Sequence, residues 1–137
     1  MHMRNFCLLI TLLLITVLVA CEQQLPSIPA PPGDYAVLEE LAEAYHQVAR
    51  DYPVQPRNMR PPGRKEFVRR IFQAAGYDYA ASLQALAGRE MDVVNQDYRD
   101  LAELLLLPHQ GLSDEAMEDL YSSEELAAIR TIEANLR

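Results

Sequence analysis

The sequence predicts an all-α domain, and three observations lead to this prediction. Apolar residues recur at three- and four-residue steps through most of the chain after residue 33. Residues that can cap a helix, such as Asp78, Ser113 and Ser122, stand just before these periodic stretches. No stretch shows the alternation and turn residues that a β-hairpin requires. We therefore expect a small bundle of four to five helices.

The first two helices are expected on either side of a proline-rich loop. Residues 34–52 have one apolar face, and Asp34 can serve as the N-cap of this helix. Residues 53–63 contain four prolines and are a poor place for regular structure. A second helix is expected over residues 64–75, and Gly76 suits the left-handed conformation that commonly follows a helix end.

A long third helix is expected next. Asp78 can cap it, and the apolar spacing continues from Leu83 through Gly88 to Leu105. This continuity predicts one helix over residues 79–107. Gly88 costs a helix about 1 kcal/mol relative to alanine, so it is also the candidate position for a break.

The C-terminal segment carries two helix-start signals. Ser113 can cap a short helix over residues 114–121. Ser122 and Glu125 have the spacing of a capping box, in which each side chain accepts a hydrogen bond from the other residue's backbone N–H. These two helices would complete a helical domain that spans residues 34–137.

The first 20 residues have the layout of a secretory signal. Arg4 supplies a positive charge, and residues 7–19 form an almost unbroken apolar run that is short for a membrane span of about 20 residues. The run closes with Leu18-Val19-Ala20-Cys21. These four residues resemble the lipobox of bacterial lipoproteins. The resemblance implies cleavage between Ala20 and Cys21, a diacylglyceryl group on the Cys21 thiol and an acylated new amino terminus.

The resemblance also implies a location. Two or more acyl chains hold a protein stably at a membrane, so the mature chain would start at Cys21 and stay there. In enterobacterial lipoproteins an Asp at the next position favours the inner membrane, and Glu22 stands there instead. We therefore expect the outer membrane, with the domain facing the periplasm. Residues 22–33 contain four prolines and are expected to form an extended tether outside the core.

The amino-acid composition argues against several kinds of partner and cofactor. The chain has 20 acidic and 12 basic residues, which argues against a nucleic-acid partner. Cys7 would leave with the signal and Cys21 would be lipidated, so no disulfide is expected and packing must supply the stability. Glu43 and His46 have the Glu-x-x-His spacing of di-iron bundles, but such a site needs two of these motifs. We expect no metal and no other cofactor.

The sequence gives little support for catalysis. No serine lies in a Gly-x-Ser-x-Gly elbow or beside an evident histidine base. His109 follows Pro108 in an expected loop, where it could titrate near neutral pH. We therefore expect a protein that is not an enzyme.

A short stretch concentrates the positive charge. Its basic residues are Arg57, Arg60, Arg64, Lys65, Arg69 and Arg70. Arginine forks suit carboxylates and phosphates, so an acidic protein surface or an anionic lipid headgroup is a natural target. We expect an envelope-protein partner with an acidic surface and assign Arg57, Arg60, Arg64 and Lys65 to the contact. The alternative is internal, in which these charges neutralise acidic helices of the same domain.

Leu106 and Leu107 belong to a second candidate contact, a run of four leucines over residues 104–107. Successive leucines point all round a helix, so the outer ones are either covered by the next helix or exposed for docking. Together these features predict a membrane-anchored, non-catalytic interaction or assembly module. The alternative is a binder of a small ligand or envelope polymer, with a pocket between helices rimmed by Tyr45, Tyr77, Tyr79 and Tyr98.

Overall fold

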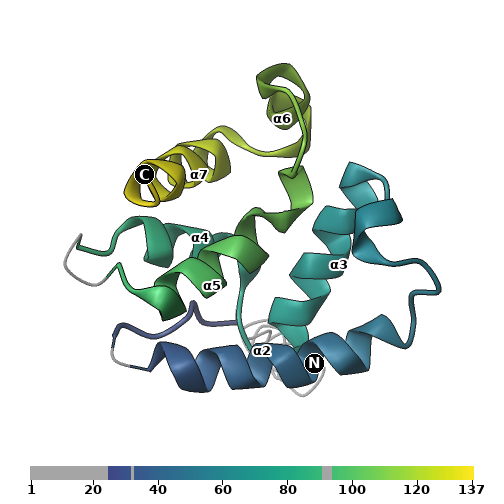
Figure 1. Cartoon of the computed structure of the whole chain (residues 1–137), viewed down its shortest axis with the longest axis horizontal. Coiled ribbons are helices and arrows are strands. Elements are labelled where there is room, and N and C mark those ends of the chain that lie inside the picture. The colour runs from purple at the N-terminus through teal and green to yellow at the C-terminus, as the bar shows by residue number, and fades with distance from the viewer. Residues whose placement is uncertain (1–24, 32, 91–93) are drawn as a thin grey trace, which may run out of the picture.

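The computed structural model describes residues 25–31, 33–90 and 94–137, so the predicted signal and Cys21 lie outside the described part of the chain. Within these residues the fold is all-α, as predicted, and contains no strand. Six α-helices are present in these ranges, where four to five were predicted (Figure 1): α2 (Asp34–Ala49), α3 (Pro61–Ala74), α4 (Tyr79–Ala87), α5 (Gln96–Leu106), α6 (Asp114–Leu120) and α7 (Ser123–Asn135). Two 3-10 helices, η1 (Pro56–Asn58) and η3 (Leu107–His109), lie between them.

The helices enclose one apolar core. Helix α2 runs along one side of the molecule and packs against α3 and α5, while α4 packs against α7 (Figure 1). Phe67 and Phe72 of α3, Leu83 of α4, Leu101 of α5 and Ile129 of α7 are almost completely buried. These side chains belong to one continuous cluster, so packing between helices holds the domain together.

The predicted long third helix is wrong, because the chain forms two helices there. Helix α4 stops at Gly88, whose backbone N–H caps the helix by donating to the carbonyls of Gln84 and Leu86. A new helix then begins at Asn95, whose side-chain oxygen accepts a 3.0 Å hydrogen bond from the Tyr98 N–H. The apolar spacing runs through the break because both helices turn an apolar face towards the same core.

The local helix signals are confirmed. Asp78 caps α4, and Ser113 caps α6, each accepting a hydrogen bond from a backbone N–H three residues ahead. Ser122 and Glu125 form the complete capping box at the start of α7. Gly76 follows α3 with a φ of 93°, a left-handed conformation that residues with side chains rarely adopt. These signals depend on neighbours within three or four residues.

Two helix starts differ from the prediction. Helix α2 has Gly33 as its N-cap, so Asp34 is the first residue of the helix and its side chain is free for another contact. Helix α3 begins at Pro61, three residues before the predicted start. Proline fits this position because the first helical N–H has no partner within the helix anyway.

The proline-rich segment before α2 is packed on the domain over residues 25–31, which we call the strap. The Ile28 side chain is 2 % exposed and belongs to the core. The carbonyl of Pro26 accepts a 2.8 Å hydrogen bond from the Asp78 N–H, and the Ile28 N–H donates to Ser82 Oγ at 3.3 Å. This part of the predicted tether therefore lies within the fold.

Candidate interaction surface

Residues 53–60, which we call the basic loop, connect α2 to α3 and present two exposed arginines. Arg57 lies in η1, a turn with no buried residue, and Arg60 immediately precedes α3. Both side chains are exposed. Among the described residues, neither guanidinium forms an ion pair or a hydrogen bond. These two charges are therefore open to a partner.

Arg64 holds the basic loop in place. Its Nε donates to the Pro56 carbonyl at 3.1 Å and its Nη2 to the Met59 carbonyl at 3.1 Å. A third, longer bond of 3.4 Å runs from Nη1 to the carbonyl of Gln110 beyond η3. The guanidinium thus satisfies carbonyls of an irregular segment that lacks a regular hydrogen-bond ladder. The structure makes Arg64 a support for the loop, whereas the sequence assigned it to partner contact.

Lys65 is also occupied inside the domain. Its ammonium lies 2.9 Å from a carboxylate oxygen of Glu125 and 2.9 Å from the carbonyl oxygen of Leu120. It also lies over the Tyr121 ring, 4.8 Å from the ring centre, which is a cation–π distance. Lys65 therefore ties α3 to the start of α7.

The remaining basic residues of the stretch pair with their own helix. Arg69 forms a 2.6 Å ion pair with Glu66, and Arg70 lies 3.5 Å from the same carboxylate. The hydrogen bond from Arg69 lowers the pKa of the Glu66 carboxyl below its usual value. Acidic residues of the same domain thus neutralise Lys65, Arg69 and Arg70. Arg57 and Arg60 remain unpaired among the described residues.

The leucine run does not form an exposed patch. Leu105 is completely buried, and Leu104, Leu106 and Leu107 are partly buried against the core. η3, which directly follows α5, packs onto α3. Leu104 also lines a shallow hollow of about 260 Å³ beside Leu38 and Tyr45 of α2.

The four tyrosines expected to rim one pocket have separate environments. Tyr79 and Tyr98 are core residues, and their hydroxyls donate to the carbonyls of Leu105 at 2.8 Å and of Leu86 at 3.4 Å. Tyr77 donates to the Glu40 carboxylate, and burial together with this bond raises the pKa of Tyr77 to about 12. Tyr45 borders shallow hollows on α2. The predicted lining of the alternative pocket is therefore wrong.

His109 is buried in η3, where the sequence predicted a loop. Its Nδ1 lies 3.0 Å from the Tyr121 hydroxyl and its Nε2 lies 3.2 Å from a Glu133 carboxylate oxygen. Burial lowers the pKa of the His109 imidazole below its ordinary value, although the Glu133 carboxylate opposes this shift. The Tyr121 ring also meets the imidazole edge to face. This arrangement links η3 to α7 and leaves His109 little access to solvent.

Glu43 and His46 are both exposed on α2. In the described ranges, no three side chains of histidine, cysteine, aspartate or glutamate lie together in a way that could hold a metal ion. Within the same ranges, no helix has the length and apolar character needed to cross a membrane.

Comparisons with known proteins give no relative for this chain. No family model, curated protein or solved structure matches it. Arguments about its function therefore rest on its own residues.

Proposed function

We propose that this protein is a lipid-anchored envelope protein that binds a partner without catalysis, and that the basic loop makes the contact. The lipobox-like residues Leu18 to Cys21 support the anchor, with Cys21 as the lipidated residue. The exposure of Arg57 and Arg60 supports the contact. Under this proposal the domain faces the periplasm from the outer membrane.

One observation carries the assignment to the basic loop. Arg64 donates to carbonyls on both sides of η1, so the loop is fixed before any partner arrives. A fixed loop loses less conformational entropy on binding than a flexible one. The backbone that carries Arg57 and Arg60 is therefore preorganised, while their side chains remain exposed.

The chemistry of this pair favours a carboxylate-rich protein surface. Each guanidinium can form two parallel hydrogen bonds with one carboxylate, a geometry that a lysine ammonium does not offer. The whole chain carries a net charge of −8, so surfaces other than the basic loop would repel an acidic partner. Electrostatic attraction would thus direct an acidic partner to the basic loop.

The contact is tested by photo-crosslinking in cells, with a probe placed at Asn58 between the two arginines. We expect a dominant adduct with one envelope protein, and loss of that adduct in the double variant Arg57→Glu, Arg60→Glu. Reversing acidic residues on the captured protein's contact surface should restore binding to this variant. Persistence of the adduct in the double variant would refute the assignment.

A matched control separates the local contact from net charge. Arg99 and Arg137 are exposed residues of α5 and of the C-terminal end, so Arg99→Glu, Arg137→Glu makes the same change in charge away from the loop. This control should keep the adduct, and equal loss in both double variants would argue for a general charge effect. The anchor is tested separately, because Cys21→Ala should remove lipid labelling and membrane association.

A further inference from the structure

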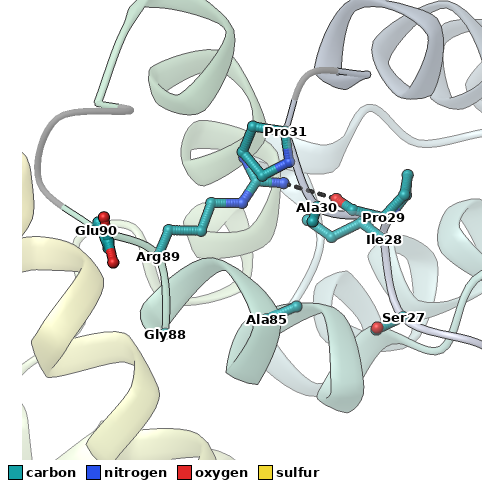
Figure 2. A pocket seen from close by; sticks show the side chains of 9 residues that line it. All are labelled: Ser27, Ile28, Pro29, Ala30, Pro31, Ala85, Gly88, Arg89 and Glu90. Carbon is teal, nitrogen blue, oxygen red and sulfur yellow. Dashed lines mark hydrogen bonds between the residues drawn. The ribbon is translucent and has the colours of Figure 1, made fainter.

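The strap, residues 25–31, is held on the domain by contacts of three kinds. Its Ile28 side chain fills the core, and its backbone is hydrogen bonded to Asp78 and Ser82 at the start of α4. The third contact comes from Arg89 at the end of α4, which donates a 3.0 Å hydrogen bond to the Pro29 carbonyl (Figure 2). The strap is thus fixed at both ends of α4.

Arg89 also joins the strap to α2. Its two terminal nitrogens lie 2.6 and 2.8 Å from the two carboxylate oxygens of Asp34. The two side chains are only 5 % and 6 % exposed. A buried charge of this kind needs its partners in place, so Arg89, Asp34 and the Pro29 carbonyl form one clamp.

A hollow of about 510 Å³ lies beside the clamp. Its lining comes from both sides of the contact, with Pro29, Ala30 and Pro31 on the strap and Ala85, Gly88 and Arg89 at the end of α4 (Figure 2). Packing on this side of the strap is therefore incomplete. The strap is held by one core side chain, Ile28, and by hydrogen bonds with Asp78, Ser82 and Arg89, so we expect its opening to be a local event.

Closure of the strap shortens the chain between the lipid and the domain. Five residue steps separate Cys21 from Pro26, and an extended chain covers at most about 18 Å over that length. With the strap released, the domain would begin at Asp34, and the same estimate gives about 47 Å. The maximum length of chain between the lipid and the domain therefore differs by about 29 Å between the two states.

The strap also enters the domain away from the basic loop. The Pro26 carbonyl is bonded to Asp78, which follows the C-terminal end of α3, while Arg60 precedes its N-terminal end. The 14 residues of α3 span about 21 Å. Helix α3 thus separates the point nearest the lipid from the surface proposed to bind the partner.

We propose that the strap sets the reach of the basic loop, and that its closed state restricts the partner to an acidic surface close to the membrane that holds the lipid. This inference rests on the proposed lipid anchor at Cys21. Release of the strap would carry the same loop to partners farther from that membrane. The contacts that would break join residues 25–31 to Asp78, Ser82 and Arg89 and to the core.

The first measurement follows strap closure by amide hydrogen exchange in the purified full-length lipoprotein. The Asp78 N–H has its acceptor on the strap, so its exchange reports whether the strap is closed. Ile28→Ser removes the apolar contact with the core, and we expect the Asp78 N–H to exchange at least about tenfold faster, with the helices still formed. Val54→Ser is the matched control, because Val54 is 46 % exposed and its loss should leave exchange unchanged.

The second measurement follows the distance between the basic loop and the membrane surface. Asn58→Cys provides a thiol for a donor dye in the mature protein, in which the Cys21 sulfur carries lipid. Energy transfer is then measured to acceptor dyes on the headgroups of vesicle lipids. We expect strong transfer in the protein with a closed strap and a clear loss of transfer in Ile28→Ser. Six Gly/Ser residues inserted between Glu22 and Gln23 should also reduce transfer, with Asp78 exchange unchanged.

The outcomes separate the two proposals. Faster Asp78 exchange without a change in energy transfer would overturn the reach proposal, as would unchanged exchange in Ile28→Ser. If Ile28→Ser fails to fold, Ser82→Ala decides in the same way, because it removes only the acceptor of the Ile28 N–H. A wild-type protein that binds vesicles no better than Cys21→Ala would instead refute the lipid anchor itself.

Discussion

The strap and the basic loop are both proline-rich connections held by one arginine, yet they differ in burial. Arg89 bonds to the strap carbonyl of Pro29, and Arg64 bonds to the loop carbonyls of Pro56 and Met59. The strap adds Ile28, which is buried in the core, while η1 of the loop contributes no buried residue. Arg89 also meets a buried carboxylate, and Arg64 meets only carbonyls.

This comparison shows what decides whether an irregular segment joins the core. Both segments contain proline, three residues in the strap and two in the basic loop, so the presence of proline does not distinguish them. One well-placed apolar side chain and one buried ion pair distinguish them. Arg89 and Arg64 already donate hydrogen bonds within the domain, so neither guanidinium is available to a partner. In the basic loop, the available charges are those of the neighbouring Arg57 and Arg60.

The largest expected effect is on the strap's clamp. Arg89→Met should lower the free energy of unfolding by about 3–5 kcal/mol, because it leaves the Asp34 carboxylate buried without its partner. Urea denaturation measures this change. Arg69→Met is the matched control, since its ion pair with Glu66 is exposed and should contribute about 1 kcal/mol or less. Equal losses in the two variants would contradict the distinction between the segments.

The next largest effect concerns the apolar contact of the strap. Ile28→Ala should cost about 2–4 kcal/mol of unfolding free energy, because it removes a core side chain and leaves a cavity. Val54→Ala in the basic loop should cost about 0.5 kcal/mol or less, because the valine is largely exposed. Thermal and urea unfolding of both variants check this. A cost for Val54→Ala as large as that for Ile28→Ala would show that the loop also belongs to the core.

A smaller effect should appear as pH dependence. Burial lowers the pKa of His109 in the folded protein, so the unfolded chain, with a histidine pKa of about 6.5, binds the proton more tightly. The stability that the neutral His109 contributes is therefore fully present above about pH 6.5. It is lost as the pH falls towards the lower pKa that His109 has in the folded state.

Replacement of His109 isolates this contribution. His109→Asn should flatten the dependence of unfolding free energy on pH below about 6.5. His46→Asn, on the exposed face of α2, is the control and should keep the wild-type slope. An unchanged slope in His109→Asn would assign the acid sensitivity to other groups.

The smallest effect on stability is expected in the basic loop. Arg57→Glu, Arg60→Glu should change the free energy of unfolding by about 0.5 kcal/mol or less, because both side chains are exposed and unpaired among the described residues. The same variant should abolish partner binding. A large loss of stability would show that these arginines support the fold. A binding defect in this variant would then result from unfolding and not from loss of a direct contact.

The sequence predicts those features of the fold that depend on near neighbours. The caps at Asp78, Ser113 and Ser122 each need a partner three residues away, and all were found. The sequence marks Gly88 as a candidate break but still predicts one helix, because an apolar stripe looks the same whether one helix or two helices cover the core. A weak signal was present, since Gly88 disfavours a helix interior and Asn95 is a good N-cap.

Contacts between distant residues explain what the sequence did not predict. Asp34 and Arg89 are 55 positions apart, and a single Ile28 among prolines has no periodic pattern to mark it as a core residue. Exposed Arg57 and Arg60 could be selected from charge and loop composition. The separate role of Arg64 could not, because one of its acceptors, Gln110, lies 46 positions away.

Helix α4 lies between the two ends of the described chain. Ser82 of α4 accepts a hydrogen bond from the Ile28 N–H of the strap. Gln84 of the same helix donates a 3.0 Å hydrogen bond to the Glu124 carbonyl, and α4 packs against α7. Because Ile129 and Ile132 of α7 are completely buried, a growing chain cannot complete this core until α7 has been synthesised. Nascent chains that lack α7 would leave the apolar face of α4 that packs against it exposed to water.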